Sequence, residues 1–192
     1  PPYPSSIDYA TLGGAIANNA AGERTIKYGV TKDFVEGVEV VLANGELIET
    51  RRLSKRELSH KKGLSTFEGE IYRQIDGLIT DNWNLIQLMK KNVSKNSAGY
   101  NLLDVKQSNG SFDLTPLIVG SQGTLGIVTE ARIRLEHNNM KRTLMVAGFK
   151  DIDAADSVIA DILKQQPAAL EIVDENLLNF VEAHHPNQLK GL

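Results

Sequence analysis

The sequence contains no cysteine, and only 6% of its residues are aromatic. The absence of cysteine excludes disulfide bonds, thiolate-bound metals, cysteine-held iron–sulfur clusters and cysteine nucleophiles within these residues. No apolar run approaches the roughly 18 residues expected of a membrane-spanning helix. A formal charge of −3 also argues against a general nucleic-acid binder.

What remains is a composition typical of a globular protein. Hydrophobic residues make up 41% of the 192 residues, which is too many for a disordered chain. A fold of this size buries about 70% of the surface that its extended chain would expose. We therefore expect one full core, or one domain together with part of another.

The two ends of the chain favour an internal piece of a longer protein. The sequence opens with Pro1-Pro2-Tyr3-Pro4, which is typical of an extended linker, and its first methionine is Met89. No secretion or import leader is recognisable at this opening. We therefore expect part of the chemistry to lie outside these residues.

Charge is distributed unevenly along the chain. Residues 51–66 hold six basic residues against Glu57 alone, and residues 151–192 hold eight acidic residues against Lys164 and Lys190. The basic stretch is consistent with contact to an anionic lipid or a phosphate. We favour a solvated loop, because that is the usual meaning of a short charge run.

Local patterns predict the elements of the first half. Residues 12–20 are expected to form a tight turn that opens into a short helix. Residues 35–42 and 47–50 have the character of strands, and the Asn44-Gly45 pair between them is a strong hairpin signal. Apolar residues recurring near every 3.6 positions predict one or two amphipathic helices over residues 68–91.

Helix and strand limits are predicted from finer signals. Ser65 and Glu68 have capping-box spacing, so Ser65 is expected to cap the amphipathic helix, with breaks at Gly77 or Asp81-Asn82. Residues 114–119 are predicted as a short buried strand. Residues 127–135 are predicted as a half-buried strand, whose odd-numbered residues share one face.

The last part of the chain predicts a second domain with β-α-β-α order. Strands are expected at residues 143–149 and 169–173, each followed by a helix. Asp151 or Asp153 would cap the first of these helices, and Asp174 the second. The boundary falls near residues 136–142, which gives domains at 1–138 and 139–192.

Two segments contain more glycine than a simple connection needs. The first glycine segment, residues 10–22, contains Gly13-Gly14, and the second, residues 120–129, has glycine at every third position from Gly120 to Gly126. Glycine lets the backbone approach a ligand closely, and free backbone N–H groups suit a diphosphate. Each segment alone is equally consistent with a tight turn or a strained connection. Neither is a G-x-G-x-x-G fingerprint or a P-loop.

Together, the two segments resemble the FAD-linked oxidases of the vanillyl-alcohol-oxidase-like superfamily. Residues 10–22 and 27–45 are similar to the family's A-T-I-G-G-x-I-A-x-N-A-G-G and R-Y-G-x-T-R-D-x-V-x-G-L-E-V-V-L-A-D-G. Residues 99–102 and 120–129 are similar to its G-Y-x-L and G-S-E-G-T-L-G-I-V-T. Several motifs in register make the resemblance specific over residues 8–136.

The resemblance implies an α+β fold. The chain would be the second subdomain of a PCMH-type FAD-binding domain, an antiparallel sheet flanked by helices, followed by the start of an α+β substrate domain. The branch includes D-lactate dehydrogenases, the flavin subunit of glycolate oxidase and D-2-hydroxyglutarate dehydrogenases. It implies FAD as the cofactor and hydride transfer from a 2-hydroxy acid to the flavin. The piece alone would be inactive and would bind FAD weakly or not at all, because half of the FAD site would be missing.

The same resemblance implies which residues contact FAD. Residues of the first glycine segment would approach the diphosphate and the flavin ring, and residues at the end of the second would offer backbone groups. For Tyr28, a half-buried tyrosine with a satisfied hydroxyl is an equal alternative. The implied cofactor-binding residues are Thr11, Gly13, Gly14, Ala17, Asn18, Gly22, Tyr28, Gly29, Gly126, Ile127 and Val128.

The chain departs from the family pattern in places. Gln122 stands where the family often has Glu, and residues 108–111 resemble a small insertion. We identify no catalytic residue and no metal ligand here; the catalytic histidine is expected beyond these residues. His184-His185 is expected at an exposed helix end, and His60 and His137 are expected to be solvated.

Other functions fit the sequence less closely. One is a flavin-binding scaffold without redox activity, and another is a non-flavin domain that reuses the two glycine turns. The resemblance implies a cytoplasmic location, with association at the inner membrane face as an alternative. It also allows an iron–sulfur domain or subunit as a partner, and predicts neither nucleic-acid binding nor a transmembrane segment.

Overall fold

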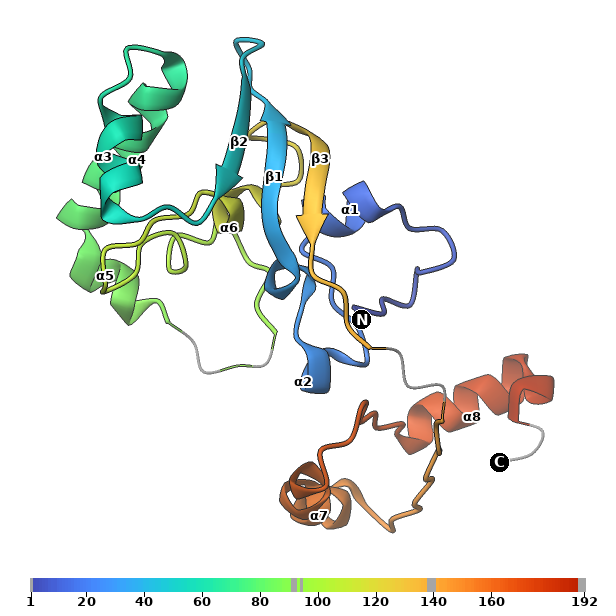
Figure 1. The fold of residues 1–192 in the computed structure, drawn as a ribbon. Coiled ribbons are helices and arrows are strands. Elements are labelled where there is room, and N and C mark those ends of the chain that lie inside the picture. The colour runs from blue at the N-terminus through green and yellow to red at the C-terminus, as the bar shows by residue number, and fades with distance from the viewer. Residues whose placement is uncertain (1, 91–92, 94, 138–140, 190–192) are drawn as a thin grey trace. The chain divides into compact units, whose positions relative to one another are not determined.

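The computed structural model describes residues 2–90, 93, 95–137 and 141–189. It divides the chain into two compact units, Pro1–His137 and Asn138–Leu192. The first unit contains a sheet with helices α1 to α6, and the second contains α7 and α8 (Figure 1).

A three-stranded antiparallel sheet in the order β2-β1-β3 lies in the first unit (Figure 1). β1 (Val35–Val41) pairs with β2 (Leu47–Arg51) across the Asn44-Gly45 turn, as the sequence predicts. Gly45 has φ of 83°, a left-handed conformation that glycine adopts at little cost. The sheet flanked by helices confirms the predicted α+β class.

The strand β3 (Ile127–Ile133) pairs with β1, so the predicted strand is confirmed. Its predicted faces are correct at Ile133, which packs on the core, but wrong at the start of the strand. The register shifts between Glu39, which faces Glu130, and Val40, which faces Val128. The extra residue in β3 is Thr129, and it reverses which side chains face inward at the start of the strand. As a result Val128 packs on the core, whereas Ile127 is 70% exposed.

The sheet is accompanied by helices of very different length and by loops. Thr11 caps α1, which confirms the short helix predicted within residues 12–20. The helical elements of the first unit are α1 (Leu12–Ala17), α2 (Thr25–Tyr28), η1 (Thr31–Asp33), α3 (Lys55–Lys62), α4 (Phe67–Asp81), α5 (Trp83–Leu88) and α6 (Thr115–Ile118).

The basic stretch is not the predicted loop, because its middle half forms α3. Ser54 and Glu57 make a capping box: the Ser54 N–H donates to Glu57 Oε2 at 2.8 Å, and the Glu57 N–H donates to Ser54 Oγ at 3.3 Å. Arg51 pairs with the same Glu57 carboxylate at 2.8 Å. These interactions hold the pKa of Glu57 at about 2, chiefly through the hydrogen bonds from Ser54.

The amphipathic stretch forms two helices that meet at Asn82. The predicted break at Asp81-Asn82 is confirmed, whereas Gly77 lies inside α4. The predicted cap at Ser65 is wrong: Thr66 is the N-cap, and its hydroxyl accepts from the Gly69 N–H at 3.3 Å.

The predicted strand at residues 114–119 is also wrong, because most of this apolar run forms the helical turn α6. Asp113 Oδ1 accepts from the Thr115 N–H at 2.8 Å, and Pro116 lies in the first turn, where its missing N–H costs nothing. The run is still buried as predicted. Apolar runs of this length do not distinguish a strand from a helical turn.

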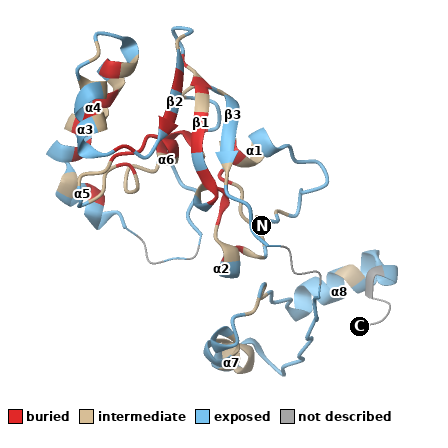
Figure 2. Cartoon of the chain, viewed as in Figure 1, coloured by how far each residue is buried: buried red, intermediate tan, exposed pale blue. Residues whose placement is uncertain are grey.

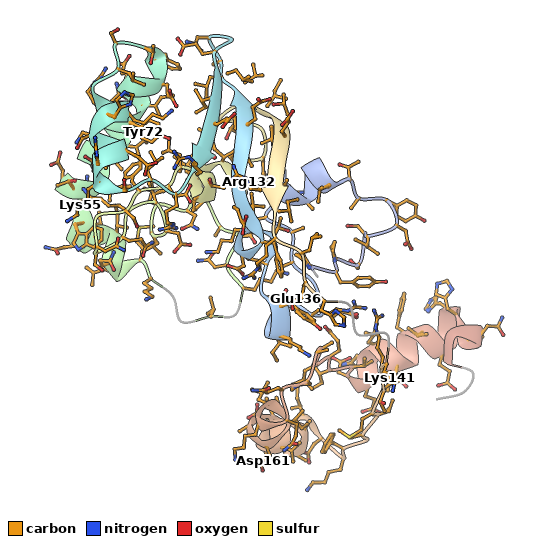
Figure 3. The ribbon with its side chains drawn as sticks, in the orientation of Figure 1. Lys55, Tyr72, Arg132, Glu136, Lys141 and Asp161 are labelled. Carbon is orange, nitrogen blue, oxygen red and sulfur yellow. The ribbon has the colours of Figure 1, made fainter. Side chains whose placement is uncertain are left out.

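Two hydrophobic clusters form the core of the first unit. One lies between the sheet, α1 and α6, and Figure 2 shows its buried positions concentrated on β1 and β2. The other joins α3, α4 and α5 to the segment before α6. At its centre the rings of Tyr72 and Phe112 lie 5.8 Å apart, and Figure 3 shows Tyr72 in the dense group of side chains around these helices.

The second unit contains α7 (Ile152–Lys164), α8 (Glu175–His184) and the turn η2 (Pro186–Leu189). Asp151 and Asp174 cap the two long helices as predicted, accepting from Ala154 and Leu177 N–H groups. The strands predicted at residues 143–149 and 169–173 do not form. A strand needs a partner for its backbone groups, and the described residues of this unit contain none.

Candidate functional site

The first glycine segment presents an open backbone at the start of α1. The Thr11 hydroxyl accepts from the Gly14 N–H at 3.0 Å, which fixes the first turn. The N–H groups of Leu12 and Gly13 have no hydrogen-bond acceptor among the described residues. A Cβ atom on Gly13 would meet nothing within 4 Å. Backbone donors are therefore accessible from outside at this point.

A shallow depression of about 290 Å³ lies beside this turn. Apart from Pro4 and Tyr9, its walls are small side chains and polar groups, which leave room for a flat or bulky ligand. It brings together three of the predicted site residues, namely Thr11, Gly14 and Asn18. The other residues that line it are Pro4, Ser6, Tyr9, Ala10, Ala15 and Ala20.

The second glycine segment makes direct contact with the first. The Gly120 N–H donates to the Ile16 carbonyl, and the Gln122 N–H donates to the Ala17 carbonyl, both at 2.9 Å. Gly120 has φ of 88°, and a Cβ on it would lie 3.2 Å from Asn19 Cβ. Gln122 contributes its main chain to this contact, so the departure from the family's Glu does not affect it. Two segments far apart in sequence thus form one continuous backbone surface.

The end of the second glycine segment lies against the sheet and not beside α1. Ile127 pairs with Val41, and Val128 pairs with Val40. A Cβ on Gly126 would lie 2.5 Å from Val40 Cγ1 and 2.7 Å from the Val41 carbonyl oxygen. Gly126 is therefore required by chain packing. None of these three predicted residues lines the depression beside Thr11.

Packing also explains the glycines that follow α1. A Cβ on Gly22 would lie 1.8 Å from the Tyr3 carbonyl oxygen, so the N-terminal segment covers this position. Gly29 has φ of 82°, and its missing side chain leaves room for the Asp33 carboxylate, which accepts from the Val30 N–H at 2.8 Å. Tyr28 is half-buried, with Lys27 Nζ 5.2 Å from its ring centre.

A third motif is tied to the second glycine segment. The Tyr100 hydroxyl lies 2.8 Å from Thr124 Oγ1, which itself donates to the Ser121 carbonyl at 2.6 Å. Neither Tyr100 nor Thr124 is among the residues implied from the sequence as cofactor-binding. The signal was present, because Gly99-Tyr100-Asn101-Leu102 is one of the motifs that carry the resemblance.

Asn19 is a second residue that the sequence analysis missed. It is 5% exposed and has φ of 47°, and its side chain accepts from the Lys32 N–H at 2.9 Å. The predicted residue, Asn18, is exposed and its side chain has no hydrogen bond among the described residues. The asparagine of the family's A-x-N-A pattern falls on Asn19, and this was the available signal.

The charged groups near these segments pair with one another. Lys32 Nζ lies 2.6 Å from Asp104 Oδ2, which also accepts from Asn101 at 2.7 Å. Burial alone would raise the pKa of Asp104, but the hydrogen bonds from Asn101 and Lys32 outweigh it and lower the pKa. Elsewhere Lys61 pairs with Glu68 at 2.5 Å. The basic stretch is thus largely neutralised within the chain, which does not favour an anion site there.

Asp76 is the most buried acidic group with two cationic partners. Its carboxylate pairs with Lys106 at 2.6 Å and with Lys62, while its side chain is 11% exposed. Burial would raise the pKa of Asp76, but hydrogen bonds from Lys106 and Lys62 lower it overall. A lowered folded-state pKa contributes stability above the unfolded pKa, and this contribution disappears as the pH falls.

We expect Asp76→Asn to lower the free energy of unfolding by about 1–2 kcal/mol at pH 7. The difference from the unsubstituted chain should shrink as the pH falls below about 4, the ordinary pKa of aspartate. Urea unfolding at pH 7, 5 and 3 measures this. Asp81→Asn, at the exposed end of the same helix, is the control. A difference that stays constant from pH 7 to 3 would contradict the ion-pair account.

No described residue forms a catalytic or metal centre of recognisable geometry. His60 and His137 are exposed as predicted, and His184 Nδ1 lies 2.9 Å from the Phe180 carbonyl at the end of α8. Within the described ranges, no three metal-ligating side chains gather. Nor does any helix there have the length and apolar character needed to cross a membrane.

Comparisons with known protein families give a match at each end of the chain. Residues 1–51 match a family model described as an FAD binding domain, and residues 138–191 match the C-terminal domain of FAD linked oxidases.

Relatives match nearly the whole chain but are much longer. The chain is 35% identical over 184 residues to the glycolate oxidase subunit GlcD of Bacillus subtilis, covering 95% of this chain and 28% of the relative. It is 33% identical over 188 residues to D-2-hydroxyglutarate dehydrogenase of Escherichia coli (93% and 18%). It is 30% identical over 183 residues to D-lactate dehydrogenase of Archaeoglobus fulgidus (95% and 30%). The chain therefore spans less than a third of each of these relatives.

Proposed function

Because the chain belongs to the FAD-linked oxidase family, we propose that it is part of an FAD-dependent oxidoreductase that oxidises a 2-hydroxy acid. The family matches confirm the predicted resemblance and FAD as the cofactor. The observation that carries the proposal is the contact between the two glycine segments, at Ile16–Gly120 and Ala17–Gln122. The substrate class rests on relatives named for glycolate, 2-hydroxyglutarate and lactate.

The open start of α1 suits a phosphate group or a polar ring edge. The Leu12 and Gly13 N–H groups are unpaired donors among the described residues, and the Asn18 amide is exposed beside them. Thr11 holds these groups in place by capping the helix. When bound, FAD supplies the hydride acceptor, and the protein positions it.

The remaining predicted site residues act by shaping the surface. Gly22, Gly29 and Gly126 allow close chain packing, which holds the loops around the sheet in place. Ala17 offers its carbonyl to Gln122, and Val128 fixes the start of β3 on the core. The exposed Ile127 side chain and the half-buried Tyr28 are available for apolar contact with the cofactor. The catalytic base is assigned to residues outside this chain.

We assign residues 1–138 to the FAD-binding domain and residues 139–192 to the start of the substrate domain. The two family matches and the two compact units support this division. Because one part of the FAD site would come from elsewhere in the whole protein, the 192-residue chain alone should bind FAD weakly. Tight stoichiometric binding of FAD to this chain would contradict the half-site assignment.

Location and partners rest on the resemblance. We propose a cytoplasmic protein, with association at the inner membrane face as the alternative. An iron–sulfur domain or subunit would accept electrons from the flavin; the naming of the Bacillus relative as a subunit is in keeping with a partner protein.

An absorbance spectrum of the whole protein tests the proposal. We expect flavin bands near about 370 and 450 nm that bleach when one acid is added from a panel of D- and L-2-hydroxy acids. Bleaching by one acid also identifies the substrate. A flavin spectrum that no acid changes would favour the redox-silent scaffold. A colourless protein, even after reconstitution with FAD, would overturn the proposal.

A further inference from the structure

Asn19 connects the end of α1 to three other parts of the first unit. Its side-chain Oδ1 accepts from the Lys32 N–H at 2.9 Å, and its carbonyl accepts from the Ser97 hydroxyl at 3.3 Å. Its Cβ packs against Gly120, where an added methyl group would lie 3.2 Å away. The residue is 5% exposed, so these contacts are shielded from water.

The contacts beside Asn19 reinforce the same junction. The Ala20 carbonyl accepts both from the Thr31 N–H at 3.0 Å and from the Thr31 hydroxyl at 2.7 Å. The Gly120 N–H donates to Ile16, one turn earlier in α1. The two glycine segments and η1 therefore meet at one point, and Asn19 is the side chain at its centre.

The conformation of this residue explains why asparagine is suited to it. A φ of 47° is left-handed, and among residues with a side chain asparagine and aspartate adopt it most readily. The partly buried Lys32 N–H also needs an acceptor, which an alanine would not provide. Aspartate keeps both properties, glycine keeps the first alone, and alanine keeps neither.

We propose that Asn19 is a positioning residue that holds the two glycine segments in register for FAD. This inference rests on the proposed function. α1 has six residues, and a helix this short is not stable on its own. The position of its exposed start, with Thr11 and Gly13, therefore depends on the junction at its other end. A small displacement of binding groups is costly for a ligand held by several backbone donors.

The test compares Asn19→Ala, Asn19→Gly and Asn19→Asp in the whole protein. The readouts are the Kd of the apoprotein for FAD and the visible circular dichroism of bound flavin. We expect Asn19→Ala to raise Kd by about tenfold or more and to change the flavin dichroism. The Kd of Asn19→Gly should lie between those of Asn19→Ala and Asn19→Asp. The Kd of Asn19→Asp should stay within about threefold of that of the unsubstituted protein. Each Kd is calculated from the concentration of folded protein, which far-ultraviolet circular dichroism measures.

Asn109→Ala is the matched control. Asn109 Oδ1 also accepts from a backbone N–H, that of Ser111 at 2.9 Å, but this bond lies within one exposed turn. An equal rise of Kd in Asn109→Ala and Asn19→Ala would overturn the proposal, and so would an unchanged Kd in folded Asn19→Ala. If Asn19→Ala does not fold, a Kd for Asn19→Asp as weak as that for Asn19→Gly overturns it. Absence of FAD binding by the unsubstituted whole protein overturns the proposed function itself, before any variant is compared.

Discussion

Replacing Phe112 by alanine is expected to lower the free energy of unfolding by about 3–5 kcal/mol. The side chain is fully buried and packs against Tyr72, with ring centres 5.8 Å apart. Its backbone exchanges two hydrogen bonds with Leu53, at 2.7 and 3.0 Å, so the surrounding chain has little freedom to fill the cavity. Urea unfolding of the 192-residue chain, followed by tryptophan fluorescence and circular dichroism, measures the change.

Phe67→Ala is the control for this experiment. Phe67 begins α4 and is 38% exposed, so its removal should cost about 1 kcal/mol or less. A similar loss for both variants would mean that the cluster around Phe112 is not a close-packed core. The predicted large loss would also show that the segment after the small insertion at residues 108–111 is structural.

Gly126→Ala is expected to cost about 2–4 kcal/mol in the absence of FAD. Its φ of 156° is unfavourable for a residue with a side chain. The new methyl group would lie 2.7 Å from the Val41 carbonyl oxygen, so the pairing of β1 with β3 must shift. Thermal and urea unfolding of the 192-residue chain measure the loss.

Gly13→Ala distinguishes a glycine needed for chain packing from a glycine that lets a ligand approach the backbone. A Cβ at Gly13 meets nothing within 4 Å, and alanine favours helix, so this variant should be as stable as the unsubstituted chain or slightly more stable. In the whole protein it should nevertheless weaken FAD binding. If Gly126→Ala leaves the stability of the chain unchanged, then Gly126 is not needed for packing, and the prediction that it offers backbone groups to FAD becomes the better explanation of this glycine.

Local signals predicted the parts of the fold that depend on neighbouring residues. The hairpin at Asn44-Gly45, the helices after Thr66 and the caps at Asp151 and Asp174 are examples. The two missing strands of the second unit have one physical cause. Residues 143–149 and 169–173 have strand character but no strand partner among the described residues of their unit, and pairing is a tertiary property.

The candidate site was predictable in its composition but not in its arrangement. Both glycine segments were found from the sequence, because several motifs occur in register. Their contact through Gly120 and Gln122 depends on the left-handed turn after α6, which no local pattern specified. The same holds for Asn19: its importance comes from Lys32, Ser97 and Gly120, all distant in sequence. The basic stretch likewise pairs with distant acidic partners such as Asp76, which local charge counting does not reveal.

The contact between Ile16 and Gly120 has a consequence for the order of events during biosynthesis. The first glycine segment leaves the ribosome on the order of 100 residues before its partner, a delay of roughly 5–20 s at ordinary translation rates. β1 and β2 can pair early because they are neighbours, whereas β3 must wait for the same distant part of the chain. The surface that we propose for FAD is thus completed only after residues beyond 122 have emerged. A nascent chain shorter than this would hold one half of the surface without the other.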